Sequence, residues 1–173
     1  MKTSVAAALV SLGAVLASPA RTPLPALPAG DGLYLGRVDS AGTFTWLFHE
    51  SSSSSSSTVV VTELAAPAEK RDGAYCEGFA AGPVGDVNAA VAAITEGCHD
   101  TYFHSAIAFQ RGGAVAYGCA YGGAGERCNG YGLGPVFSSI AAGCGPGNAG
   151  YYELDVDGYE ARFGYTRAGN GFC

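Results

Sequence analysis

All six cysteines of this chain lie in its C-terminal part, from residue 76 onward. An even number of cysteines in a short domain is typical of a disulfide framework, which supplements a core too small to stabilise the fold alone. Structural metal sites use paired short spacings such as Cys-x-x-Cys, and the chain contains no such spacing. We therefore predict three disulfides and no metal site, with the pairing left open. The cysteines are Cys76, Cys98, Cys119, Cys128, Cys144 and Cys173.

The N-terminus has the organisation of a secretory signal peptide. Lys2 precedes an almost unbroken apolar run over residues 5–16, and Ala17 is a small residue of the kind signal peptidase requires, with Ala20 as the alternative. The run is shorter than the roughly 20 apolar residues that span a bilayer. We predict that residues 1–17 are removed, that no membrane anchor follows and that the protein is secreted.

Residues 18–71 have the composition of a pro-segment. Prolines crowd its beginning and serine fills residues 51–57, so we expect most of the segment to be flexible. Residues 33–35 and 43–48 form an exception, because their β-forming side chains predict a hairpin that covers an apolar face of the following domain. The segment ends at Lys70-Arg71, a pair typical of kexin-type processing, where we expect its removal. An incidental surface pair is the alternative.

The predicted mature domain, residues 72–173, carries the whole net charge of −6, with ten acidic residues, four arginines and no lysine. A chain with this balance repels phosphate backbones and anionic membrane surfaces. We therefore expect no nucleic-acid partner.

The domain contains two similar halves. Residues 76–84 match residues 128–136 at Cys, two Gly, Pro and Val, and each copy continues into a short apolar helix that ends in Gly-Cys. Each half then has β-rich sequence and closes on a third cysteine. This order predicts an α+β fold, a small disulfide-stapled α/β sandwich of two pseudo-repeated β-α-β-β halves with an antiparallel sheet and two helices. Chance similarity in Gly- and Ala-rich sequence is the alternative.

Apolar spacing and end signals predict the two helices. We expect Asp86 as the N-cap of the first helix and Gly97 in a left-handed conformation after its end. The second helix should have Pro135 in its first turn and stop at Gly143. The expected buried stripes are Val87, Ala90, Val91 and Ile94 in the first helix, and Val136, Phe137 and Ile140 in the second.

Two hairpins are predicted after the helices. Residues 107–109 and 115–119 alternate in polarity around Gly112-Gly113. The second hairpin closes at Asp157-Gly158, which is a strong signal for a two-residue turn. Such a turn sets the register, and it pairs Val156 with Tyr159, Asp155 with Glu160, Leu154 with Ala161 and Glu153 with Arg162.

This register gives the second hairpin an acidic outer face. Asp155 lies opposite Glu160, and like charges in directly opposed positions destabilise a sheet slightly. Either solvent or a cationic partner should therefore face them. Asp157 and Tyr159 are placed at the tip of the same hairpin. The candidate binding residues are Asp155, Asp157, Tyr159 and Glu160.

Together these features resemble the fungal killer-toxin-like secreted proteins, a group of smut-fungus killer toxins and small effectors of plant-associated fungi. The resemblance covers the mature domain and rests on Lys70-Arg71, Cys76 before the helix at 86–91, residues 114–119, 142–145 and 150–152, and the terminal Gly171-Phe172-Cys173. It implies a toxin or effector that binds its target without catalysis. The implied partner is a host or competitor protein or a cell-surface molecule, and we expect a monomer without a cofactor.

A secreted guanyl-specific ribonuclease is the alternative. Tyr102-Phe103-His104 and residues 122–127 echo parts of that family, and Arg162 or Arg167 would contact phosphate. His99-Asp100 adds further groups capable of acid–base chemistry. RNA cleavage requires a proton donor and a proton acceptor, but this chain has Tyr165-Thr166-Arg167 where that family has its second histidine. We therefore expect no catalytic residues and prefer the binding function.

Overall fold

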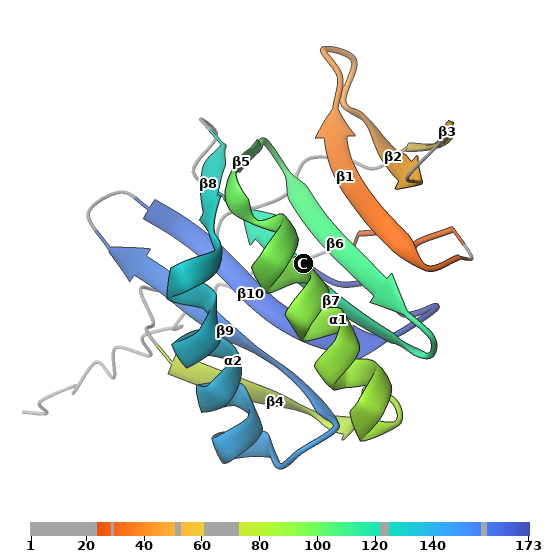
Figure 1. Ribbon diagram of the computed structural model, residues 1–173. Coiled ribbons are helices and arrows are strands. Elements are labelled where there is room, and N and C mark those ends of the chain that lie inside the picture. The colour runs from red at the N-terminus through yellow and green to blue at the C-terminus, as the bar shows by residue number, and fades with distance from the viewer. Residues whose placement is uncertain (1–23, 29, 51–52, 61–72, 122–124, 157–158) are drawn as a thin grey trace, which may run out of the picture.

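The computed structural model describes residues 24–28, 30–50, 53–60, 73–121, 125–156 and 159–173. These residues form ten strands and two helices (Figure 1). The elements are β1 (Gly32–Val38), β2 (Thr43–Glu50), β3 (Ser53–Val60), β4 (Gly73–Ala80), α1 (Val84–Gly97), β5 (His99–Phe103), β6 (Ala106–Arg111), β7 (Ala114–Ala120), β8 (Glu126–Asn129), α2 (Gly130–Cys144), β9 (Asn148–Val156) and β10 (Tyr159–Arg167).

Eight of these strands form one antiparallel sheet in the order β3-β2-β1-β6-β7-β10-β9-β4, and β5 pairs with β8 in a second, smaller sheet. Both helices lie on the same face of the large sheet (Figure 1). Helix α1 contacts β6 and β7, and α2 contacts β4 and β9. The predicted α+β class with its antiparallel sheet and two helices is confirmed.

The two pseudo-repeated halves interlock. The first contains β4, α1, β6 and β7, with the short β5 inserted after the helix, and the second contains β8, α2, β9 and β10. Strands β7 and β10 pair at the junction between the halves. Strand β4 of the first half pairs with β9 of the second half. Neither half therefore has a complete sheet of its own.

Each of the three disulfides joins one half to the other. The bonds are Cys76–Cys144, Cys98–Cys128 and Cys119–Cys173. The first cysteine of each half bonds to the second cysteine of the other half, and the third cysteines bond to each other. This pairing is symmetric between the halves, and it accounts for all six cysteines.

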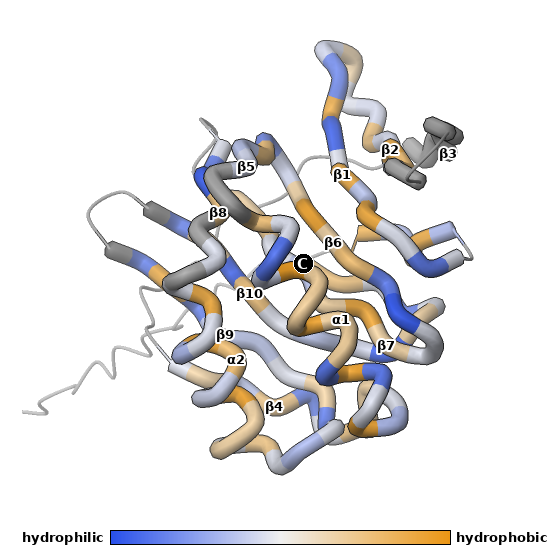
Figure 2. Tube along the Cα trace, in the orientation of Figure 1, coloured by the Kyte–Doolittle hydropathy of each residue, from blue (hydrophilic) through white to orange (hydrophobic). Residues whose placement is uncertain are grey.

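The main core lies between the helices and the sheet. Val87, Ala90 and Ile94 of the predicted α1 stripe are buried and Val91 is partly buried, while the predicted α2 residues Val136, Phe137 and Ile140 are all buried. Strand β6 is hydrophobic until it approaches the turn into β7 (Figure 2). Burial of this apolar surface is the main contribution to the stability of the domain.

The ends of α1 differ from the prediction. The helix begins at Val84 with Pro83 as its N-cap, and Asp86 lies in the first turn, where its carboxylate accepts a hydrogen bond of 2.8 Å from the Gly113 N–H. Asp86 therefore joins the helix to the β6–β7 turn instead of capping it. Gly97 is the last helical residue, and a Cβ there would lie 2.2 Å from the Phe109 ring. Close packing, and not a left-handed conformation, explains this glycine.

Helix α2 begins earlier than predicted. It starts at Gly130, so Pro135 lies inside the helix and not in its first turn, and it ends at Cys144, one residue beyond Gly143. The additional first turn buries Leu133 in the core between the helices and the sheet. Tertiary packing therefore outweighs the glycine-rich local sequence, which disfavours a helix.

Both predicted hairpins are confirmed. Strands β6 and β7 turn at Gly112-Gly113, and Gly112 has a φ of 51°, in the left-handed region where glycine is favoured. Strands β9 and β10 pair Val156 with Tyr159, Asp155 with Glu160, Leu154 with Ala161 and Glu153 with Arg162, in the predicted register. Asp157 and Gly158 lie outside the described residues.

The segment before the domain is more ordered than its composition suggested. The predicted hairpin at 33–48 is confirmed as β1 and β2, and Asp39 accepts N–H hydrogen bonds from Ala41 and Thr43 in its turn. Strand β1 also pairs with β6 and so extends the sheet of the domain. Outside that hairpin, the expectation of flexibility is wrong for residues 24–28, whose Leu24 and Leu27 are buried against the domain, and for the serine-rich β3, which pairs with β2.

Candidate functional site

Strands β9 and β10 present different chemistry on their two faces. Tyr152 and Leu154 of β9 and Phe163 of β10 pack toward the helices. Because side chains alternate along a strand, Glu153 and Asp155 of β9 lie on the opposite face. Their cross-strand partners Arg162 and Glu160 lie there with them. The sheet face without helices therefore carries the charged residues of this hairpin.

The neighbouring strands add tyrosines and another acid to this face. On β4, the Tyr75 ring stacks on that of Tyr151 with 5.3 Å between centroids. Glu77 follows two residues later and accepts a hydrogen bond of 3.4 Å from the Thr166 hydroxyl. We name this set the acidic–aromatic face, and it consists of Tyr75, Glu77, Tyr121, Tyr151, Glu153, Asp155, Glu160 and Arg162.

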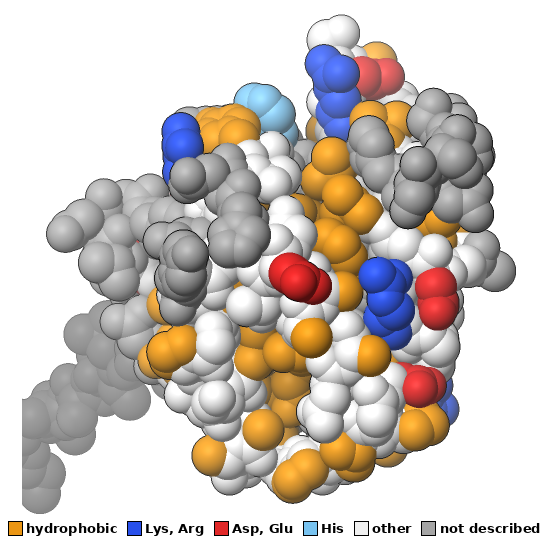
Figure 3. All heavy atoms as spheres, in the orientation of Figure 1, with side chains coloured by type: hydrophobic (Ala, Val, Ile, Leu, Met, Phe, Trp, Pro, Cys, Tyr) orange, Lys and Arg blue, Asp and Glu red, His pale blue; other side chains and the backbone are white. Residues whose placement is uncertain are grey.

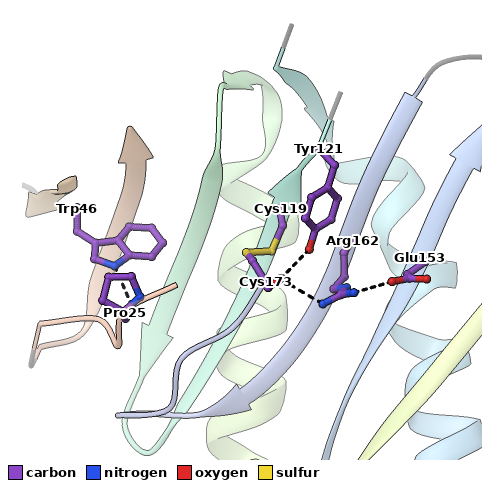
Figure 4. Close-up of a disulfide and its surroundings, with 7 residues drawn as sticks. All are labelled: Pro25, Trp46, Cys119, Tyr121, Glu153, Arg162 and Cys173. Carbon is purple, nitrogen blue, oxygen red and sulfur yellow. Dashed lines mark hydrogen bonds and ion pairs between the residues drawn. A yellow bond between two sulfur atoms is a disulfide. The ribbon is translucent and has the colours of Figure 1, made fainter. Parts of the chain in front are cut away.

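On the acidic–aromatic face, Arg162 lies between Glu153 and Cys173, below the Tyr121 ring (Figure 4). Its Nη2 donates to Glu153 Oε1 at 2.6 Å, and its Nη1 donates to the main-chain oxygen of Cys173 at 3.5 Å. Its guanidinium carbon lies 4.1 Å from the centroid of the Tyr151 ring and 5.6 Å from that of Tyr121. The sheet therefore holds a cationic group between a carboxylate and aromatic rings, both of which attract it.

Burial and neighbouring charges shift the pKa values on this face. Burial alone would lower the pKa of Arg162, but Tyr121, the Glu153 hydrogen bond and two further tyrosines raise it overall. Burial raises the pKa of Glu77, although the Thr166 hydrogen bond and the charge of Arg162 oppose that shift. Arg162 is thus held as a cation, while Glu77 ionises less readily than a solvated glutamate.

The predicted acidic pair is present on this face. Asp155 and Glu160 lie directly opposite one another and are both partly exposed. The Glu160 N–H donates to the buried Glu126 carboxylate at 3.3 Å. Burial raises the pKa of Glu126, with the Glu160 N–H lowering it and the Glu160 charge raising it. Of the other candidates, Asp157 and the Tyr159 side chain lie outside the described residues.

Sequence reasoning missed the aromatic part of the site. The predicted register already placed Glu153 opposite Arg162, and strict alternation would have added Tyr151 to the same face. Tyr75 and Glu77 lie on this face because β4 pairs with β9. Strand β4 has no hairpin partner next to it in the sequence, so no local pattern predicts which strand it pairs with.

The helix-bearing side of the molecule shows only scattered charged side chains among the described residues (Figure 3).

The residues of the ribonuclease alternative have other contacts. The exposed His104 ring meets Tyr102 edge-on at 5.0 Å. Arg167 donates to the Ala80 carbonyl at 3.1 and 3.3 Å, and Arg162 is bound to Glu153. The side chains of His99 and Asp100 lie outside the described residues. Both arginines that would contact phosphate are therefore engaged within the fold.

The described residues contain no group of three His, Cys, Asp or Glu side chains placed to hold a metal ion. Their helices are also too short or too polar to cross a membrane. Comparison with protein-family models, curated proteins and solved structures found no match. Three disulfides are typical of proteins that fold in an oxidising compartment.

Proposed function

We propose that this chain is the precursor of a secreted, disulfide-stabilised protein that binds a cationic protein surface through its acidic–aromatic face. In line with the resemblance to killer-toxin-like proteins, its target lies outside the producing cell, on a competitor or a host. It acts as a toxin or effector by binding and not by catalysis.

The environment of Arg162 carries this proposal. It shows that carboxylates and tyrosine rings on this face hold a guanidinium, with Glu153 at 2.6 Å and the Tyr151 ring at 4.1 Å. The exposed part of the face offers the same groups. Asp155 and Glu160 are partly exposed carboxylates, and Tyr75 stacks on Tyr151 farther along the same strand. A Lys or Arg side chain of a partner would form a favourable charge–charge contact with Glu160.

The experiment compares two variants that each remove one negative charge. Glu160→Gln changes the acidic–aromatic face, and Glu96→Gln changes an exposed position of α1. We expect Glu160→Gln to reduce binding of the purified protein to intact cells of rival fungi or to plant tissue several-fold, whereas Glu96→Gln should bind like the wild type. Equal losses in both variants would show a net-charge effect and contradict a localised site.

The ribonuclease alternative has its own measurement. The purified protein is incubated with RNA, and so is its His104→Gln variant. We expect no cleavage by the wild type. Hydrolysis that disappears in His104→Gln while Glu160→Gln retains it would contradict the binding proposal.

A further inference from the structure

The segment before the predicted cleavage site occupies a defined position in the sheet. Strand β1 pairs antiparallel with β6, from Gly32 opposite Gln110 to Gly36 opposite Ala106. In the second half, the equivalent edge belongs to β9 and is covered by β4. Strand β8, which repeats β4, pairs with β5 and leaves the β6 edge to β1. The N-terminal segment therefore supplies the strand that the repeat leaves unfilled.

The same segment supplies five of the twelve buried residues of the second apolar core. Five of its side chains are buried on the face of β6 and β7 that lies opposite the helices, together with Phe172 near the end of the chain. The Trp46 ring lies 5.6 Å from the Phe172 ring, which stacks on Tyr117 at 4.5 Å. The five side chains are Leu24, Leu27, Tyr34, Phe44 and Trp46.

Hydrogen bonds hold this apolar contact in register. The Leu24 N–H donates to the Phe172 carbonyl at 2.7 Å. Within the segment, the Trp46 indole N–H donates to the Pro25 carbonyl at 3.1 Å and so fixes the ring against residues 24–28 (Figure 4). Asp31 accepts a hydrogen bond of 2.8 Å from the Gly112 N–H in the β6–β7 turn. The contact between the segment and the domain therefore resembles a protein core, because apolar side chains are buried in it and its hydrogen-bond donors have acceptors.

We infer that residues 24–60 stay bound to the domain after the chain is cut, so that the mature protein is a non-covalent complex of two chains. The inference rests on the predicted cut at Lys70-Arg71. All six cysteines pair within the domain, so no disulfide would hold the N-terminal chain. Its loss would expose the β6 edge and the apolar side of β7 to water, a known liability for aggregation. The N-terminal chain therefore functions as a subunit of the protein.

The test uses the full chain, cut in solution with a kexin-type protease. Denaturing mass spectrometry establishes complete cleavage, and native mass spectrometry with size-exclusion chromatography at micromolar concentration measures association. We expect both fragments in one particle. Trp46 is the single tryptophan of the chain, so its fluorescence should keep the blue-shifted emission of a buried indole after the cut. Separation of the fragments with a red-shifted emission would overturn the inference.

Two variants with the same added charge provide the control. Leu27→Asp places a carboxylate in the apolar core, while Ala26→Asp places one at the exposed neighbouring position. After cleavage, Leu27→Asp should release the N-terminal fragment and Ala26→Asp should retain it. Retention in both variants would show that the buried contact does not hold the segment. If the protease does not cut, the processing proposal fails, and the same measurements use a chain with another protease site in place of Lys70-Arg71.

Discussion

Gly118 of β7 and Phe163 of β10 lie directly opposite one another, and the Phe163 ring occupies the space in which a side chain of Gly118 would lie. A Cβ at Gly118 would be 2.5 Å from the ring. The next pair reverses this arrangement, because Gly164 lies opposite Tyr117, and a Cβ there would be 2.7 Å from the Tyr117 hydroxyl. Each central strand therefore provides a glycine that receives an aromatic ring from the other strand.

Gly118→Ala should destabilise the domain. Phe163 is fully buried and cannot move aside without disturbing the core, so the free energy of unfolding should fall by about 1–3 kcal/mol. Gly132→Ala is the control, because a Cβ at this exposed helical position meets nothing within 4 Å and alanine favours a helix. Chemical denaturation measures both. A Gly118→Ala protein as stable as the wild type would contradict the close packing at the centre of the sheet.

The effects of Arg162 and Glu153 on the free energy of unfolding should be strongly coupled, because the two side chains form an ion pair. Their side chains are only 10% and 13% exposed, and removing one member of a buried pair leaves a charge without compensation, at a cost of about 3–5 kcal/mol. We expect Arg162→Ala to destabilise by this order. Arg162→Met retains the apolar stem and separates packing from charge. The Arg162→Ala/Glu153→Ala double variant should lose less than the sum of the single losses, and additive losses in the cycle would refute the coupling.

The three disulfides should be reduced in an order set by their exposure. Cys76 is exposed, whereas Cys98 and Cys128 are fully buried. A reductant should therefore open Cys76–Cys144 first and Cys98–Cys128 late, because thiol–disulfide exchange requires access to a sulfur atom. Partial reduction, alkylation and peptide mass spectrometry identify the first pair opened. Early alkylation of Cys98 would contradict this order.

Glu77 should make stability depend on pH. Burial raises its pKa in the folded protein, so the unfolded chain releases this proton more readily. The protonated Glu77 side chain therefore contributes to the free energy of unfolding. This contribution is fully present below the pKa of about 4.3 in the unfolded chain and is lost as the pH rises through the higher pKa of the folded protein. Glu77→Gln should therefore gain in melting temperature relative to the wild type as the pH rises through that range. Glu96→Gln controls for the lost charge, and a gain independent of pH would contradict the prediction.

Processing predicts a new N-terminus in the secreted material. If Lys70-Arg71 is cut, N-terminal sequencing of the culture medium should find a chain that begins at Asp72. Under native conditions a second chain that contains Trp46 should accompany it. Secreted protein that begins only at Ser18 would show that the pair is not processed.

The helices and hairpins of this protein follow from short-range patterns in its sequence. The apolar stripes of both helices follow from a period that neighbouring residues set. The Asp157-Gly158 signal predicted the β9–β10 register, and with it the opposition of Asp155 and Glu160, because a predicted two-residue turn leaves only one register for the flanking strands. An even cysteine count likewise predicted that all six cysteines pair.

The way in which these elements join depends on contacts between distant parts of the chain. Cys76 bonds to Cys144 because the halves interlock, and no spacing along the chain encodes that arrangement. Tyr75 joins the acidic–aromatic face through the pairing of β4 with β9, and Trp46 is buried because β6 has an edge for β1 to cover. Which strands pair and which surfaces are buried depends on contacts between residues far apart in sequence. Local sequence patterns do not predict the free energies of those contacts.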